Sequence, residues 1–403
     1  MSDTSRGPRG RAGSFEALAL FAVAACTASA GIAHAQWTLP QGQLVLNAGY
    51  DFQYADSEFF GQTGEARRER SFPLNGQFFG SQMTFDARLG LTDDLEVEVL
   101  VPLRVVAYTS DPVLLLQQPM DSPLSSLDFY QQNIIELSQA TAGLADMQFV
   151  GRYRFLPAPF LLTGELRLKV PGGYAGPQGT FGSQPVTGQA LLDNIQTVVT
   201  PANVSDDVTL GDGQVDVIAR LLAGAAFDTG TFVAGDVAYN ARFEDAGHQL
   251  LASVRAGQFI EGIVLLFAGA SFGISVTEGR VIGVSVAAID PELPADQYGG
   301  LNNLMLREVR LQRDFLDVYG GVIFRLSPEV ELKLAYARTV WGRNTAAVST
   351  FSIAVGARTT LFEPPAPEPL EEELADEEPA YEEPAYEAPA TAPPADEANT
   401  EGV

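Results

Sequence analysis

Two alternating stretches between Gly143 and Gly173 constrain the fold of this chain more than any other feature. From Phe160 to Val170, apolar residues such as Leu166 alternate with polar residues such as Arg167, and the preceding stretch behaves in the same way. A side-chain period of two is that of a β-strand with one apolar and one polar face. Each stretch has roughly 11 residues, the length that a tilted strand needs to cross a bilayer.

The same alternation recurs along the chain and predicts about twelve strands, joined by short turns and by much longer connections. The predicted strands are Gly42–Ala55, Phe79–Leu91, Leu95–Tyr108, Gly143–Phe155, Phe160–Val170, Gly213–Phe227, Thr231–Phe243, Gln249–Gln258, Ile263–Val276, Arg313–Leu326, Val330–Trp341 and Thr350–Phe362. Short turns at one end and long loops at the other are typical of an outer-membrane barrel, and in lipid the sheet must close so that every backbone group is paired. We therefore predict an all-β fold, a transmembrane up-and-down antiparallel β-barrel of about twelve strands spanning residues 36–362. The alternative is a soluble periplasmic β-sandwich or lipocalin-like barrel, which needs a second apolar layer.

Several positions predict departures from a regular barrel. Pro102 lies inside a predicted strand and, because proline cannot donate to the ladder, we expect a bulge or pairing irregularity there. In the long loop Thr109–Ala142, the segments Leu114–Leu116 and Asn133–Ile135 are apolar enough to fold inward or to form short helices.

Aromatic residues near the predicted strand ends would form interfacial girdles: Trp37, Tyr54, Tyr108, Phe155, Phe160, Phe243, Trp341 and Phe362.

The N-terminus reads as a targeting segment. Three arginines precede an apolar run at Ala17–Ala25, and a small-residue cleavage site follows at Ala33–Ala35, so residues 1–35 are predicted to be a secretory signal peptide. An alternative stays open, since Val23–Cys26 resembles a lipoprotein cleavage box that would leave Cys26 lipidated. Cys26 is the only cysteine, so a chain cleaved after Ala35 has no disulfide.

Residues 363–403 are predicted to form a disordered periplasmic tail rich in Pro, Glu and Ala. The tail holds 14 acidic residues and no Lys or Arg, and Glu-Glu-Pro-Ala-Tyr occurs twice, ending at Tyr381 and at Tyr386. High charge and proline content prevent a packed core. The tail is either a solvated spacer or a binding segment for a periplasmic partner, with the two tyrosines as anchors.

The polar faces of the predicted strands carry the candidate functional residues. The inward-facing, pore-lining set is Glu96, Glu98, Arg104, Arg152, Arg154, Glu165, Arg167, Lys169, Asp216, Arg220, Asp236, Arg242, Asp317, Arg325, Glu331 and Lys333. These charges either pair across the lumen and fill it or guide a solute. The interior of an eight-stranded barrel is filled by side chains, whereas a barrel of sixteen strands leaves an open channel. A barrel of about twelve strands therefore predicts a narrow path. Arg152, Arg154, Arg167 and Lys169 on neighbouring strands would make one wall cationic, favouring anionic or amphiphilic solutes.

Enzymatic and nucleic-acid-binding functions are disfavoured. His248 lies near Glu244, Asp245 and Ser253, which would suit a Ser–His–acid hydrolase at the barrel rim, but proximity in sequence is not a nucleophile–base hydrogen bond. With one histidine after residue 35, we expect no metal, no cofactor and no catalysis. The net charge of −27 argues against binding to phosphate backbones.

Several hairpin motifs resemble one known family. The motifs are Gly143-Leu144-Ala145-Asp146, Gly151-Arg152-Tyr153-Arg154-Phe155-Leu156, Val170-Pro171-Gly172-Gly173, Leu210-Gly211-Asp212-Gly213, Leu89-Gly90-Leu91-Thr92-Asp93-Asp94-Leu95 and Val101-Pro102-Leu103. Together they resemble the outer-membrane phenol meta-pathway degradation or putative transporter family. The resemblance covers most of residues 42–362 and implies a barrel that takes up aromatic or other apolar small molecules. Arg152 stands where the family has Lys, and Pro171-Gly172-Gly173 replaces its Pro-Thr-Gly.

The leading hypothesis is therefore a passive transporter or narrow porin of the bacterial outer membrane. Its predicted partners are outer-membrane lipid and a small-molecule solute. The alternative is a structural barrel whose tail recruits a periplasmic partner.

Overall fold

The computed structural model describes residues 38–60, 68–114, 120–128, 134–135, 138–157, 160–177, 208–289 and 304–362. The predicted signal peptide, the lipidation alternative at Cys26, Trp37 and the acidic tail lie outside these residues.

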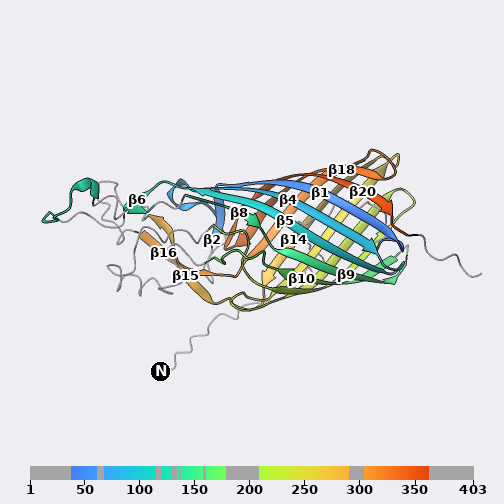
Figure 1. Ribbon diagram of the computed structural model, residues 1–403, viewed down its shortest axis with the longest axis horizontal. Helices are drawn as coiled ribbons and strands as arrows, with labels where there is room; N and C mark the ends of the chain where they lie inside the picture. Colours follow the sequence, from blue (N-terminus) through green and yellow to red (C-terminus); the bar gives the residue numbers. More distant parts are fainter. Residues whose placement is uncertain are drawn as a thin grey trace, which may run out of the picture. The chain divides into compact units, whose positions relative to one another are not determined.

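Within the described residues, the strands form a closed antiparallel β-barrel (Figure 1). The barrel has twelve strands when β8 and β9, which follow one another beside β5, are counted as one. They are β1 (Gln43–Ala55), β4 (Gln77–Gly90), β5 (Leu95–Thr109), β8 (Gln139–Leu144) continued by β9 (Met147–Leu156), β10 (Phe160–Val170), β11 (Asp216–Ala226), β12 (Thr231–Arg242), β13 (Gln249–Ile260), β14 (Val264–Ser275), β17 (Asp314–Arg325), β18 (Val330–Arg343) and β20 (Ser349–Thr360). Neighbours in the barrel are also neighbours along the chain, and β1 closes the ring by pairing with both β4 and β20. The prediction of an up-and-down barrel of about twelve strands is confirmed.

The two ends of the barrel differ in their connections. The turns after β4, β9, β11, β13 and β17 contain three or four residues, and we call this the turn end. Gly230 and Gly262 take positive φ values of 80° and 69° in two of these turns, a conformation that glycine adopts without strain. The opposite end, where most connections are longer, is the loop end.

The ladder is interrupted opposite Pro102. Leu103 pairs with Leu144 on β8, whereas Leu100 pairs with Gln148 on β9, so three residues face two at this point. The Ala145 amide donates to the Pro102 carbonyl at 3.0 Å. This bulge splits one barrel strand into β8 and β9, as expected from a proline without an amide hydrogen.

The faces of the barrel are inverted relative to a soluble protein. Large apolar side chains point outward and are exposed, for example Tyr50 at 42%, Leu334 at 40% and Ile353 at 46%. Charged side chains point inward and are buried, with Glu96 fully inaccessible. An apolar outer band over a polar interior is the pattern of a transmembrane barrel. In the described part of the chain, no helix is long and apolar enough to cross a membrane.

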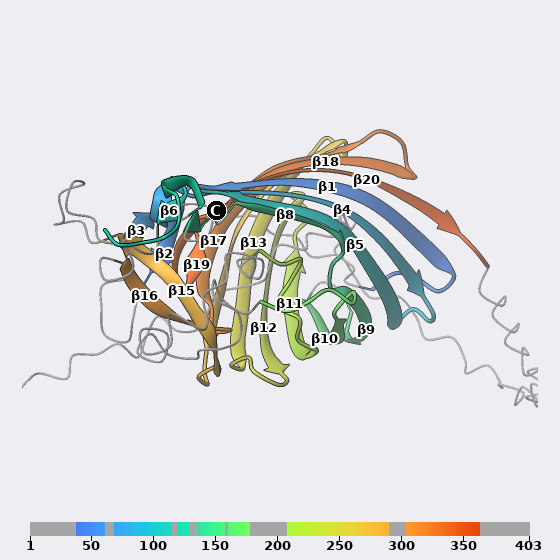
Figure 2. The ribbon, with the colours of Figure 1, turned by 60° about the vertical axis from the view of Figure 1, so that its left-hand side comes forward.

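The loop end carries small sheets that the alternation did not predict (Figure 2). These are β2 (Ser57–Phe60) with β3 (Arg68–Ser71) and β19 (Thr345–Ala346), β6 (Val113–Leu114) with β7 (Ile134–Ile135), and β15 (Val281–Ile289) with β16 (Leu304–Arg310); a 3-10 turn, η1, covers Pro73–Asn75. Of the two expectations for the apolar segments of this loop, short helices are contradicted at Leu114, Ile134 and Ile135, which lie in paired two-residue strands. Leu115, Leu116 and Asn133 lie outside the described residues.

Most of the predicted aromatic girdle residues lie on the outer surface. Phe155, Phe160, Phe243 and Phe362 are all more than two-fifths exposed. Tyr108 is an exception, because it follows the inward-facing Val106 by two positions and packs edge-on against Phe72 with ring centroids 5.6 Å apart. The prediction that Tyr108 faces the membrane interface is therefore wrong.

The outer band predicts a depth-dependent cost for charge. Val237 lies halfway along β12 on the outer face, and Val233 lies four positions closer to the turn end on the same face. We expect Val237→Arg to reduce the free energy of unfolding by about 2–4 kcal/mol and Val233→Arg by about 0–1 kcal/mol. Reversible urea unfolding in liposomes measures both. Equal costs at the two depths would contradict a membrane-embedded outer face.

Candidate functional site

A cluster of ion pairs fills one side of the barrel interior between β4 and β12. We call it the mid-barrel ionic cluster, and it consists of Arg88, Glu96, Glu98, Arg152, Glu165, Arg167, Arg220 and Asp236. Arg152 lies at its centre and contacts three carboxylates, Glu96 at 2.6 Å, Glu98 at 2.5 Å and Glu165 at 2.7 Å. Arg88 binds Glu96 at 2.9 Å from the neighbouring strand. The alternation along β5, β9 and β10 places these side chains on one inner face, and their opposite charges compensate for burial.

The cluster continues around the barrel through longer contacts. Arg220 on β11 lies 3.6 Å from Glu165 and 3.5 Å from Asp236 on β12. Ser253 on β13 donates a hydrogen bond to Asp236. Charged side chains therefore occupy this side of the interior across successive strands and leave little room beside them.

A second group of charges, the loop-end ionic cluster, lies nearer the loops. It consists of Asp146, Lys169, Asp212, Asp216 and Arg242. Lys169 binds Asp212 at 2.6 Å, Asp216 at 2.9 Å and Asp146 at 3.4 Å, and Arg242 pairs with both Asp212 and Asp216. Although burial acts to raise it, the pKa of the Asp212 carboxyl is held below its ordinary value by Lys169 and Arg242.

The described ends of the connection between β10 and β11, residues 171–177 and 208–215, contact the barrel wall at this cluster. Burial and a hydrogen bond to Asp146 raise the pKa of the Tyr174 phenol well above its ordinary value. Leu210 packs against Val106 and Ala145. Its carbonyl accepts a hydrogen bond of 3.1 Å from Arg104. The short segment around Leu210 therefore narrows the loop end of the lumen.

A corresponding contact narrows the turn end. Thr38 and Leu39 are buried, and the Leu39 amide donates to the Glu96 carboxylate at 2.8 Å. The Thr38 hydroxyl donates to the Asp93 carbonyl at 3.2 Å in the turn between β4 and β5. The segment that precedes β1 thus contacts the mid-barrel ionic cluster. Nothing in its sequence pattern predicted this contact.

The remaining interior is a cavity of about 890 Å³. It is bordered at the turn end by Gly230 and Gly262 and towards the loop end by Leu210 and Arg313. Opposite the mid-barrel ionic cluster its wall is formed by small inward-facing residues, namely Gly49 on β1, Ala335 and Ala337 on β18, and Ser352 and Ala354 on β20. The cavity exists on this side because these side chains do not reach the barrel axis.

The structure brings the predicted charged residues to the inner face of the barrel. Those that border the cavity are Arg104, Arg152, Glu165, Arg167, Lys169, Arg220, Asp236, Arg325 and Lys333. Those that contact neighbouring inward side chains by ion pairs or hydrogen bonds are Glu96, Glu98, Asp216, Arg242, Asp317 and Glu331. Arg154 lies at the turn-end rim, 2.8 Å from Asp94. Asp86, Arg88 and Arg255 also border the cavity, and the same alternation would have added them to the set.

The expected cationic wall on β9 and β10 is wrong. Arg152 and Arg167 bind Glu165, Lys169 binds three aspartates, and Arg154 binds Asp94, so carboxylates neutralise each of the four cations. These carboxylates lie on the same strands, on adjacent strands or in connecting segments, and the alternation along β9 and β10 alone does not locate those in the connecting segments.

Cations exceed carboxylates on the opposite side instead. The inward positions of β13, β14, β17, β18 and β20 carry the cations Arg255, Arg325, Lys333 and Arg358 and the carboxylates Asp317 and Glu331. Asp317 accepts a hydrogen bond of 2.6 Å from Thr339, and Glu331 lies 3.6 Å from Arg325. At these strand positions four cations are therefore present beside two carboxylates, and Arg255 and Lys333 have further interaction partners.

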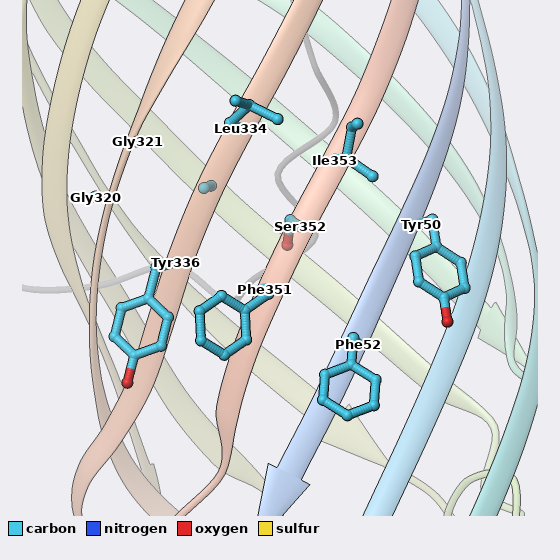
Figure 3. A pocket seen from close by; sticks show the side chains of 10 residues that line it. Tyr50, Phe52, Gly320, Gly321, Leu334, Tyr336, Phe351, Ser352 and Ile353 are labelled. Atoms are coloured by element: carbon cyan, nitrogen blue, oxygen red, sulfur yellow. The ribbon is translucent and has the colours of Figure 1, made fainter.

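A separate depression of about 540 Å³ lies on the outer surface of β1, β17, β18 and β20 (Figure 3). The rings of Tyr50, Phe52, Tyr336 and Phe351 surround it, and Gly320 leaves its floor without a side chain. Its lining is almost entirely apolar and belongs to the outer band. It therefore faces lipid and is not part of the interior cavity.

The arrangement around His248 does not form a hydrolase triad. His248 Nδ1 accepts a hydrogen bond of 3.1 Å from the Arg242 amide. Ser253 donates to Asp236 and not to the histidine, and Asp245 pairs with Arg280 at 2.8 Å. A nucleophile, its base and its orienting acid must be mutually hydrogen-bonded, and these three groups are not.

No protein-family model and no curated protein sequence matches the chain. Among solved structures, an outer membrane channel from Pseudomonas putida F1 is similar with a TM-score of 0.49 and 11% identity, over 80% of this chain and 97% of that chain. The translocator domain of autotransporter NalP from Neisseria meningitidis is similar with a TM-score of 0.37 and 10% identity, over 80% of this chain and 91% of that chain. The CymD monoaromatic hydrocarbon channel is similar with a TM-score of 0.33 and 10% identity, over 81% of this chain and 90% of that chain. Similarities of this size support no statement about function, and the resemblance to the phenol meta-pathway family stays an expectation.

The mid-barrel ionic cluster predicts unequal costs for two neighbouring arginines. Arg152→Met leaves three buried carboxylates without their shared cation and should reduce the free energy of unfolding by about 3–5 kcal/mol. The matched control is Arg154→Met two positions along β9, whose partner Asp94 has a side chain that is 50% exposed. We expect this control to cost about 0–1 kcal/mol. Urea unfolding in liposomes measures both, and a cost for Arg152→Met no larger than the control would contradict a central role for Arg152.

Proposed function

We propose that this protein is a passive, narrow channel of the bacterial outer membrane for small solutes. The observation that carries the proposal is the interior cavity, whose lining reaches from the turn-end glycines Gly230 and Gly262 to Leu210 and Arg313 towards the loops. Its polar and charged lining suits a water-filled path. The apolar outer face and the closed ladder supply the membrane-spanning wall.

The outer membrane is the compartment that fits this architecture. Transmembrane barrels with short turns at one end and long loops at the other belong to it, with the turns towards the periplasm. The predicted signal peptide at residues 1–35 is consistent with export. The turn end would then face the periplasm, and the segment at Thr38–Leu39 would lie at the periplasmic mouth.

The size of the cavity favours small solutes. A volume of about 890 Å³ lies within the range of roughly 300–1,000 Å³ that holds one drug-sized ligand, and it extends along the barrel. The contacts of Leu210 and Leu39 narrow both ends. A selective path fits this geometry better than a general pore. A charged lining also disfavours solutes that are purely apolar, since they offer no partner for the charged groups.

Blocking the small-residue wall tests the proposal. Ala335 on β18 faces the cavity, and the adjacent Leu334 faces the outside. We expect Ala335→Trp to reduce single-channel conductance in planar bilayers several-fold, because the indole fills the space beside the ionic cluster. Leu334→Trp, the matched control, should leave conductance unchanged. Absence of any conductance or liposome swelling for the unaltered protein would overturn the proposed function, and equal effects of the two substitutions would contradict the position of the path.

A further inference from the structure

We propose that residues 209–213, which we call the Leu210 strap, form a movable constriction that limits the size of solute entering the cavity from the loop end. The inference rests on the proposed function, because it names the element that regulates passage along the same path. Leu210 and Gly211 border the cavity, and residues 209–213 belong to no strand of the barrel. The strap can therefore leave the wall without breaking the backbone ladder that closes the barrel.

An apolar wedge fixes the strap at Leu210. The Leu210 side chain is buried and packs against Val106 on β5 and against Ala145 at the bulge. Gly143 on β8 makes room for it, since a Cβ there would lie 2.9 Å from a Leu210 methyl carbon. Arg104 donates a hydrogen bond of 3.1 Å to the Leu210 carbonyl. Truncation of the Leu210 side chain would therefore remove the wedge and leave the wall around it intact.

An ionic anchor fixes the strap at Asp212. The Lys169 ammonium on β10 lies 2.6 Å from the Asp212 carboxylate, which also pairs with Arg242 on β12. Arg242 in turn donates to the Leu311 carbonyl at 3.2 Å, in the connection before β17. Asp212 thus joins the strap to a chain of contacts that runs part of the way around the mouth of the barrel. Removing its charge would break both ion pairs at once.

Two sequence motifs that lie far apart in the chain meet at the middle of the strap. A Cβ on Gly211 would overlap the Tyr174 hydroxyl and lie 2.7 Å from an Asp146 carboxylate oxygen. Tyr174 donates to Asp146 and accepts a hydrogen bond of 3.1 Å from the Gly213 amide. The motif at residues 210–213 and the motif that ends at Asp146 therefore form one interlocking surface, which closure of the barrel does not require.

The kind of contact makes the strap the part of the mouth that can yield. Each contact described above involves a side chain, whereas the neighbouring strands β10 and β11 are held by a continuous backbone ladder. Segments held outside a ladder open locally at a lower free energy than core strands do. A small solute passes the strap in place, and a bulkier one enters only while the wedge and the ionic anchor are released.

Cysteine accessibility measures release of the strap without requiring conduction. Ala145→Cys, introduced in a Cys26→Ser background of the full chain, lies behind Leu210 and should react slowly with a water-soluble thiol reagent. Adding Asp212→Asn or Leu210→Ala should raise this rate several-fold, because the strap then leaves the wall more often. Thr163→Cys, fully buried near the turn-end start of β10, should react slowly with or without these substitutions.

Each fixing contact has a matched control. Asp245→Asn removes the same charge from another loop-end connection, where Asp245 pairs with Arg280 at 2.8 Å. Leu250→Ala removes the same side chain from the outer face at the loop end of β13. Neither control should change the rate at Ala145→Cys. Gly211→Ala displaces the strap by steric overlap and serves as a third release variant, and thermal unfolding of each protein establishes that it is folded.

Liposome swelling tests size selection with two uncharged solutes. Swelling with the small sugar arabinose should change little in Asp212→Asn, because this solute already passes the strap in place. Swelling with the bulkier sucrose should rise several-fold in Asp212→Asn and stay unchanged in Asp245→Asn.

The two readouts separate this inference from the proposed function. An unchanged rate at Ala145→Cys in all folded release variants would overturn the movable strap and leave the channel. Equal sucrose swelling in Asp212→Asn and Asp245→Asn would overturn size selection by the strap and leave the channel. If the rate at Ala145→Cys rises but neither sugar enters through the unaltered protein or any variant, the channel function is overturned and the mobility of the strap stands.

Discussion

Closure of the backbone ladder is the constraint on which the rest of the structure depends. A membrane offers no hydrogen-bond partner to an exposed strand edge, so β1 must pair with both β4 and β20. Once closed, each strand has one face towards lipid and one towards the lumen. The apolar residues take the outer face, and the charged residues are left inside, where burial would be costly unless they pair.

Ion pairs fill one side of the barrel interior, and small side chains on the other side leave the open part of the lumen. The mid-barrel ionic cluster around Arg152 holds β4 to β12 together and fills its half of the interior. Alanine, serine and glycine on β1, β18 and β20 leave the other half open. A twelve-strand barrel is too wide to fill completely with ordinary side chains and too narrow for a general pore, so this asymmetry sets the position of the path.

Much of the barrel could be predicted from the sequence because its pattern is local. Alternation with a period of two located the strands and the inward position of residues such as Glu165, and Pro102 indicated the bulge that separates β8 from β9. Charge compensation could not be predicted in the same way, since Lys169 is neutralised by aspartates up to dozens of positions away in the chain. The contact of Leu39 with Glu96 and the small loop sheets depend on such non-local contacts as well. The inward position of Tyr108, in contrast, follows from the alternation along β5 that also places Val106 inside.

The most direct test of the path is the accessibility of single cysteines in intact membranes. Cys26 is the only cysteine of the chain, so each new cysteine can be introduced in a Cys26→Ser background. Ala337→Cys and Ala354→Cys should react rapidly with a water-soluble, negatively charged thiol reagent. Thr163→Cys, at a fully buried position within the ionic wall, and Leu334→Cys on the lipid face should react slowly. Rapid reaction at Thr163, or none at the two alanine positions, would contradict a path along the small-residue wall.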